Sequence, residues 1–95
     1  MLQHYVLIRY EKNVSNEHVE EFCRRMLALR TSIAGIEYLE IGRDILHDER
    51  SWDLILIMRF VSIGELRSYQ QHPDHQKLIT FNQPFVAAVA SVDFE

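Results

Sequence analysis

The chain has 95 residues, of which 47% are hydrophobic and 25% are charged, and its formal net charge is -4. This size and balance predict one globular domain over residues 1–95, and the acidic charge disfavours a nucleic-acid partner, because phosphate binding requires a basic surface. The lone Cys23, a longest apolar run of only residues 54–58 and the lack of a secretory leader predict a cytoplasmic protein with no internal disulfide and no membrane partner.

Near-alternation of apolar and polar residues predicts a first strand over residues 2–10. His4 is the polar member of an otherwise apolar row on one face of this strand, which also carries Val6 and Ile8. Its imidazole is therefore expected among core side chains. Two interpretations stay open: a core histidine satisfied by a backbone partner, or a group that faces a pocket.

A long helix is predicted over residues 16–34, with Ser15 as its N-cap and Gly35 as its left-handed stop. Apolar residues recur along it at spacings of three and four, which indicates one buried face. The members of this stripe are Val19, Phe22, Cys23, Met26, Leu29 and Ile33.

A second strand is predicted over residues 36–43, followed by a polar loop over residues 44–51. The third strand, residues 52–60, is apolar on both faces, so both faces of the sheet should be covered. Helices of so small a chain can cover only one face, and the other face is expected to meet a second subunit. The pattern predicts a homodimer.

A capping box at residues 62–65 predicts a second helix over residues 63–72. Pro73 ends this helix and opens a short third helix that runs through Asn82. Alternation over residues 85–95 predicts the last strand. The order is that of an α+β, ferredoxin-like βαββαβ domain with a four-stranded antiparallel sheet and a short extra helix before the last strand.

A set of short motifs runs in order along essentially the whole chain: Met1-Leu2-Gln3-His4, Gly35-Ile36, Glu40-Ile41-Gly42-Arg43, Trp52-Asp53-Leu54, Tyr69, His72-Pro73-Asp74-His75 and Val92-Asp93-Phe94. In these residues the chain resembles the stress-responsive α/β-barrel domain family, within the broader group of dimeric α+β barrels. The resemblance implies a homodimer in which two sheets face each other and close a barrel. The family includes stress-associated plant and bacterial proteins and a plant polyketide cyclase, so the resemblance predicts fold better than reaction.

Cyclase-like members of that family use a tyrosine and a histidine, which match Tyr69 and His75, to handle a proton during ring closure. An imidazole of near-neutral pKa can remove a proton beside a carbonyl, and a phenol hydroxyl can stabilise the resulting enolate. His75 should be biased toward its neutral form by the nearby helix N-terminus. The turn that contains His72 and Pro73 would aim both groups at one cavity. No glycine-rich loop, paired cysteine motif or HExxH motif is present, so neither a cofactor nor a metal is expected.

His4 and Asp93 form a second candidate constellation. In the expected strand order the last strand lies beside the first, so Asp93 approaches His4 and can orient its imidazole. The apolar side chains expected to line the pocket are Val6, Ile8, Phe22 and Met26.

Several interpretations compete with the cyclase-like or lyase-like enzyme. Tyr69 can pack with its hydroxyl on backbone, with His72 as a helix cap and His75 in solvent. The dimer can also bind a small apolar or aromatic ligand without turnover, or protect through its stability alone. A cofactor-free monooxygenase of the same barrel group is a further alternative, which oxygen dependence of the product would distinguish.

Overall fold

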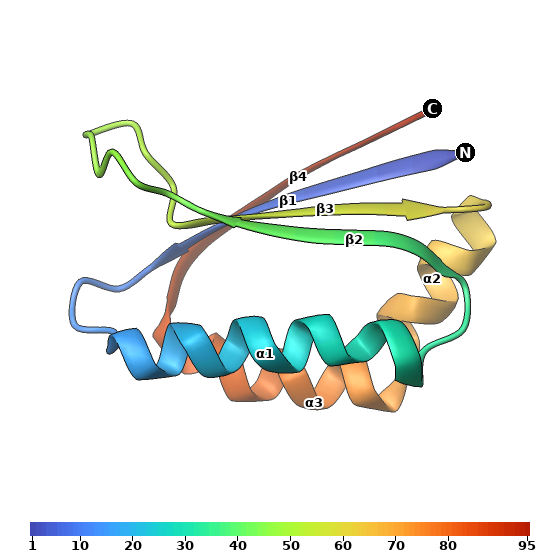
Figure 1. The fold of residues 1–95 in the computed structure, drawn as a ribbon, viewed down its shortest axis with the longest axis horizontal. Helices are drawn as coiled ribbons and strands as arrows, with labels where there is room; N and C mark the ends of the chain where they lie inside the picture. Colours follow the sequence, from blue (N-terminus) through green and yellow to red (C-terminus); the bar gives the residue numbers. More distant parts are fainter.

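The computed structural model describes residues 1–95. Its elements are β1 (Leu2–Tyr10), α1 (Asn16–Ser32), β2 (Ile36–Arg43), β3 (Leu54–Phe60), α2 (Ile63–Gln71), α3 (Pro73–Asn82), a 3-10 turn (Gln83–Phe85) and β4 (Val86–Phe94). The strands form one antiparallel sheet in the order β2-β3-β1-β4, with the helices beneath it (Figure 1). The predicted α+β ferredoxin-like order, including the extra helix before the last strand, is confirmed.

Two helix ends differ slightly from the predicted ones, for local reasons. Helix α1 ends at Ser32, because Ile33 is already extended and only its backbone N–H still bonds to the helix; Gly35 follows with φ +98°. Helix α2 ends at Gln71, because His72 precedes a proline and takes the extended conformation that this position favours, with ψ 136°.

Strand β3 begins at Leu54 rather than at Trp52. The preceding Asp53 instead makes two hydrogen bonds to the end of β1. Its backbone N–H donates to the Ile8 carbonyl at 2.9 Å, and its carboxylate accepts from the Tyr10 backbone N–H at 2.7 Å. These bonds fix the end of β1 against the start of β3. They involve a long-range contact that alternation along one strand does not reveal.

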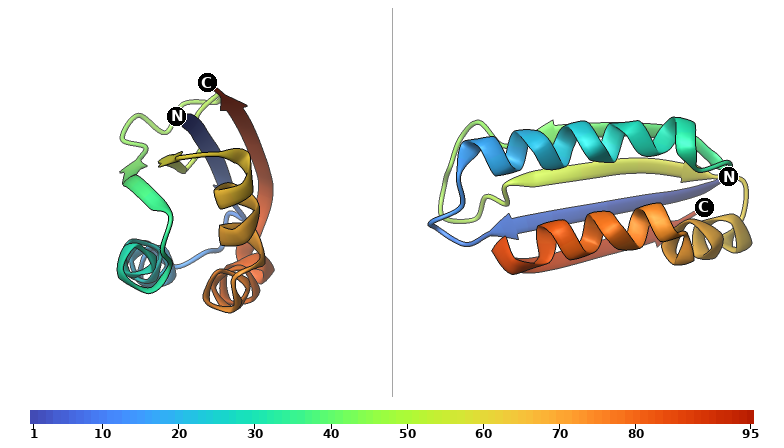
Figure 2. Two further views of the ribbon diagram at one scale, coloured as in Figure 1. Left: turned by 90° about the vertical axis from the view of Figure 1, so that its right-hand side faces the viewer. Right: turned by 90° about the horizontal axis from the view of Figure 1, so that it is seen from below.

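The core lies between the helices and one face of the sheet. Its most deeply buried large side chains are Phe60, Met26, Leu54 and Met58. Two views at right angles show α1 and α3 side by side beneath the strands, with α3 under the β1–β4 edge (Figure 2). No helix of the chain has both the length and the apolar character needed to cross a membrane.

The opposite face of the sheet carries no helix (Figure 1). Strand registers place two rows of side chains across it: Tyr5 beside Ile57 and Val92, and Leu7 beside Ile55 and Ala90. These side chains are apolar or aromatic, and Val92 is 64% exposed. The expectation that helices cover only one face is confirmed.

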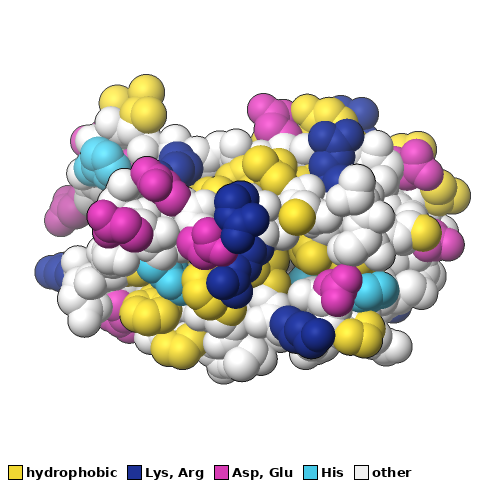
Figure 3. All heavy atoms as spheres, turned by 60° about the horizontal axis from the view of Figure 1, so that its bottom comes forward, with side chains coloured by type: hydrophobic (Ala, Val, Ile, Leu, Met, Phe, Trp, Pro, Cys, Tyr) yellow, Lys and Arg dark blue, Asp and Glu magenta, His cyan; other side chains and the backbone are white.

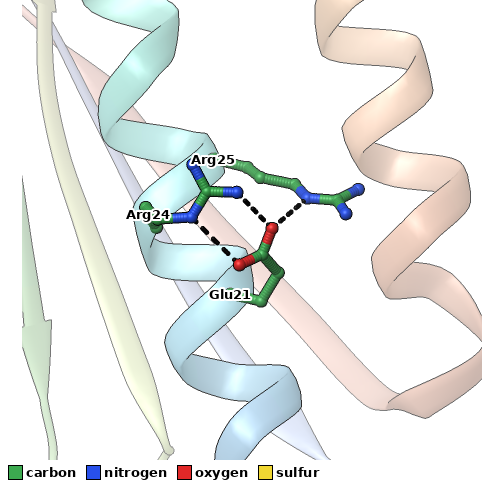
Figure 4. A network of polar contacts seen from close by, with 3 residues as sticks. All are labelled: Glu21, Arg24 and Arg25. Carbon is green, nitrogen blue, oxygen red and sulfur yellow. Dashed lines mark hydrogen bonds and ion pairs between the residues drawn. The ribbon is translucent and has the colours of Figure 1, made fainter.

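A cation–π contact at the surface joins helices α1 and α3. Glu21 binds Arg24 and Arg25 within α1, and the Arg25 side chain reaches toward α3 (Figure 4). Its guanidinium lies 4.0 Å from the centre of the Phe81 ring. The helix side of the molecule otherwise mixes acidic, basic and hydrophobic groups without a field of one sign (Figure 3).

Candidate functional site

A cavity of about 280 Å³ lies between the sheet and the helices. Most of its wall is apolar, and it includes the four residues that the sequence assigned to a pocket lining. The apolar wall residues besides Tyr69 are Val6, Ile8, Phe22, Met26, Leu56, Leu78, Ile79, Val86 and Val89, and the polar ones are His4, His75, Asn82 and Gln83. Ile79 and Val89 are 43% and 60% exposed, so the cavity opens to solvent between α3 and the edge strand β4.

Tyr69 reaches the cavity from α2, and its ring packs against the His75 ring from α3. The ring centroids are 4.3 Å apart. Burial raises the pKa of the Tyr69 hydroxyl well above its usual value, so the group stays protonated. Its sole hydrogen-bond partner is the Met26 sulfur at 3.9 Å, a weak acceptor that a ligand oxygen would readily replace.

His75 has one ring nitrogen fixed and the other free. Its Nδ1 lies 3.1 Å from the Gln70 carbonyl oxygen, and because a carbonyl only accepts, Nδ1 must carry the hydrogen. The unshared electron pair of the neutral ring is therefore on Nε2. Burial lowers the pKa of His75, nearby His4 and His72 lower it further, and the bond to Gln70 opposes them in part. His75 is consequently a neutral base near physiological pH, mainly through burial.

His4 lines the same cavity from β1, directly opposite Asp93 on β4 in the strand register. The His4 Nδ1 is hydrogen-bonded to the Asp93 carboxylate. A carboxylate accepts and does not donate, so Nδ1 holds the hydrogen and Nε2 is again the free nitrogen. The structure thus brings His4, Tyr69 and His75 to one cavity, with Asp93 behind His4 rather than on the wall.

His72 and Pro73 lie outside the cavity wall and shape the turn between α2 and α3. The His72 Nδ1 accepts a hydrogen bond from the Asp74 backbone N–H at 3.1 Å, which makes it the N-cap of α3. Pro73 occupies the first turn, where its missing N–H costs nothing. This turn sets Tyr69 and His75 against each other.

Sequence reasoning missed a polar cluster at the end of α3. Asn82 is 4% exposed and lines the cavity. Its Oδ1 lies 2.6 Å from the Tyr10 hydroxyl and 2.9 Å from the His18 Nε2. The signal that could have shown it is spacing, because Asn82 follows His75 by seven residues and so shares its face of the helix.

The site has the groups for proton transfer. No three His, Cys, Asp or Glu side chains lie close enough together to hold a metal ion. The wall instead offers a protonated phenol, a neutral imidazole and a carboxylate-oriented imidazole around an apolar space. Such a set can polarise a carbonyl oxygen and remove a neighbouring proton.

Solved structures share this fold. A dimeric ferredoxin-like protein of unknown function from Thermobifida fusca is 24% identical, with a TM-score of 0.87 over 98% of this chain and 88% of its own. A dimeric protein of ferredoxin-like fold from Bacteroides fragilis is 23% identical, with a TM-score of 0.88 over 99% and 94%. The hydroxynitrile lyase of Passiflora edulis is 13% identical, with a TM-score of 0.85 over 98% and 90%. At these identities the likeness shows the fold alone.

No curated protein matches the chain in sequence. The family model described as "Stress responsive A/B Barrel Domain" matches residues 2–95, nearly the full length. The motifs at both ends of the chain, His4 and Asp93 among them, fall within that match. The chain therefore belongs to the stress responsive A/B barrel domain family.

Proposed function

We propose that the protein is a homodimer that binds a small, largely apolar or aromatic carbonyl compound and performs cofactor-free acid–base chemistry on it, of a cyclase-like or lyase-like kind. The observation that carries the proposal is the contact between the Tyr69 and His75 rings on the wall of one apolar cavity. The cavity volume of about 280 Å³ suits a small ligand. The single, half-buried Cys23 suits a reducing compartment such as the cytoplasm.

In this mechanism the ligand carbonyl oxygen accepts a hydrogen bond from the Tyr69 hydroxyl, in place of the weak contact with Met26. The His75 Nε2 removes a proton from the carbon beside the carbonyl. The electron pair of that C–H bond forms a C=C bond to the carbonyl carbon, and the π pair of the C=O bond moves to the oxygen, which gives an enolate that Tyr69 stabilises. The apolar wall strengthens this hydrogen bond, because few water molecules compete with it.

His4 would serve as the second proton carrier. The Asp93 carboxylate fixes its tautomer, so its Nε2 is available to the same cavity. Protonating both histidines at once is unfavourable, since a charge on His4 lowers the pKa of His75.

The homodimer would form through the open face of the sheet. The central side chains of this face are apolar, and packing them against a second copy removes that surface from water. The proteins from Thermobifida fusca and Bacteroides fragilis that share the fold are themselves described as dimeric. The chain would close the barrel by pairing two such faces.

Binding without turnover is the second candidate, and the mostly apolar wall favours it. One experiment separates the two. The probe is 4-methoxyacetophenone, whose acetyl hydrogens lie beside a carbonyl, and proton NMR in deuterium oxide follows their replacement by deuterium.

Acid–base chemistry predicts that the protein accelerates this exchange and that Tyr69→Phe and His75→Ala each remove most of the acceleration. A thermal shift with no exchange would instead establish a binding protein. The absence of both a thermal shift and exchange would refute both candidates.

A further inference from the structure

The polar wall residues of the cavity are spread along α3. His75 lies in the first turn of this helix, against Tyr69, and Asn82 is its last residue. From His75 to Asn82 the helix rises about 10 Å, and β1, which carries His4 near its start and ends at Tyr10, runs in the same general direction in the sheet (Figure 2). The other wall residues except His4 and Gln83 are apolar or aromatic, so the cavity offers hydrogen-bonding groups near both ends of α3 within a mostly apolar wall.

The Asn82 side chain is held in one orientation. Its Oδ1 receives the Tyr10 hydroxyl hydrogen, and burial raises the pKa of Tyr10 to about 12, so that donor persists. The His18 Nε2 is the second donor to the same oxygen. His18 is itself wedged between the Phe81 and Phe85 rings, at centroid distances of 4.6 and 4.2 Å. Flipping the amide would leave the buried Tyr10 hydroxyl without an acceptor.

The Asn82 amide nitrogen makes no hydrogen bond within the chain, although the residue is almost fully buried. No fully enclosed side-chain nitrogen or oxygen lacks a partner, so this nitrogen reaches open space. The cavity is the space that Asn82 lines. The Asn82 amide oxygen has two donors, whereas its nitrogen has no acceptor within the chain. This nitrogen can therefore donate a hydrogen bond to a ligand in the cavity.

We infer that Asn82 is a specificity-determining residue, whose amide N–H binds a hydrogen-bond acceptor at the end of the ligand remote from Tyr69 and His75. The ligand class is thereby narrowed to elongated, mostly apolar carbonyl compounds with an ether or carbonyl oxygen at the far end. Tyr10 and His18 are positioning residues, which act by fixing the amide. The inference rests on the proposed function of the same cavity.

The test uses two probes that differ in one atom group. 4-Methoxyacetophenone carries an ether oxygen where 4-ethylacetophenone carries a methylene, and their shapes nearly match. Calorimetric titration of the full chain should show the methoxy probe bound about threefold to tenfold more tightly, the effect of one hydrogen bond. Asn82→Asp keeps an acceptor for Tyr10 and His18 but presents a carboxylate oxygen to the cavity, so at alkaline pH this affinity ratio should fall to about one or below.

Tyr10→Phe provides the readout of positioning. It leaves the Asn82 amide in place but removes one of the two donors that fix its orientation, so the affinity ratio should decrease while the methoxy probe stays the better ligand. The inference would be overturned if the affinity ratio of the two probes were the same in the parent protein, Asn82→Asp and Tyr10→Phe. If both probes still bound and underwent deuterium exchange, the proposed function would stand. If neither probe binds to the parent protein, both fall together.

Discussion

His4 on β1 and Asp93 on β4 are register partners, and their side chains are hydrogen-bonded on the helix-covered face of the sheet. They are 89 positions apart in the chain, and Asp93 lies at the end of the edge strand. The bond satisfies a buried imidazole nitrogen and at the same time selects the tautomer in which Nε2 carries no hydrogen. The contact therefore contributes to stability and, in the proposed mechanism, to proton transfer, and substitutions can separate the two.

Asp93→Leu should destabilise the protein by about 1–2 kcal/mol, because it leaves the buried His4 nitrogen without an acceptor. Asp93→Asn should cost less than about 1 kcal/mol, since its amide oxygen still accepts the bond and the lost charge is partly solvated. Urea denaturation measures both. Equal losses for the two variants would show that His4 does not need this acceptor.

Tyr69→Phe should separate catalysis from packing. The phenyl ring preserves the contacts with His75 and Phe60, and the lost hydroxyl has only the Met26 sulfur as a partner, so stability should change by less than about 1 kcal/mol. The exchange rate of the acetophenone probe should fall roughly 10²-fold, because the enolate loses its donor.

Tyr38→Phe is the matched control for this variant. The Tyr38 hydroxyl bonds to Glu40, away from the cavity. Its removal should leave the exchange rate within about twofold of the parent, since a hydroxyl outside the site stabilises no charge in the reaction. A comparable loss of exchange in both variants would contradict the role given to Tyr69.

The exchange rate should depend on pH through His75. Its pKa lies below the ordinary value of 6.5, chiefly because the ring is buried. The His75 imidazole is therefore neutral and active at a pH above its lowered pKa. Below this pKa the exchange rate should fall about tenfold per pH unit. Proton NMR titration of the His75 ring gives the midpoint. A midpoint above the ordinary value would contradict this account.

The lowered pKa of His75 also makes the stability of the fold depend on pH. The unfolded chain binds a proton on His75 at a higher pH than the folded chain does, so the free energy of unfolding decreases as the pH falls through the ordinary value toward the lowered pKa. Above the ordinary value this contribution is complete. His75→Gln should remove the corresponding slope, which urea denaturation across this pH range will show.

Association should depend on the open face of the sheet. Sedimentation at micromolar concentration should give twice the 11.3 kDa mass of one chain. Ile57→Glu places a charge beside Tyr5 in one of the two apolar rows and should yield monomers, because burying an unpaired carboxylate is costly.

Leu27→Glu is the control for this experiment. Leu27 is 45% exposed on α1, on the helix side of the molecule. It should leave the mass unchanged. A parent protein that sediments as one chain, or a control that dissociates as readily as Ile57→Glu, would refute the proposed interface.

Local chemistry explains why the elements could be predicted. Ser15 and Ser62 accept hydrogen bonds from the first turns of α1 and α2, and Pro73 separates α2 from α3. These signals involve residues a few positions apart, so they can be recognised in the sequence. The small errors at Trp52 and His72 arose where a contact from another strand, or the backbone preference before a proline, set the boundary.

The sequence by itself determined the βαββαβ order, the family and the apolar faces, because periodicity and capping act between near neighbours in the chain. Only the tertiary structure showed that Asn82 shares the cavity with Tyr69, His75 and His4. Asn82 meets Tyr10 across 72 positions and His18 across 64. Those contacts depend on how α3 lies over β1 and beside α1. That placement results from packing of the whole core, and no local pattern encodes it.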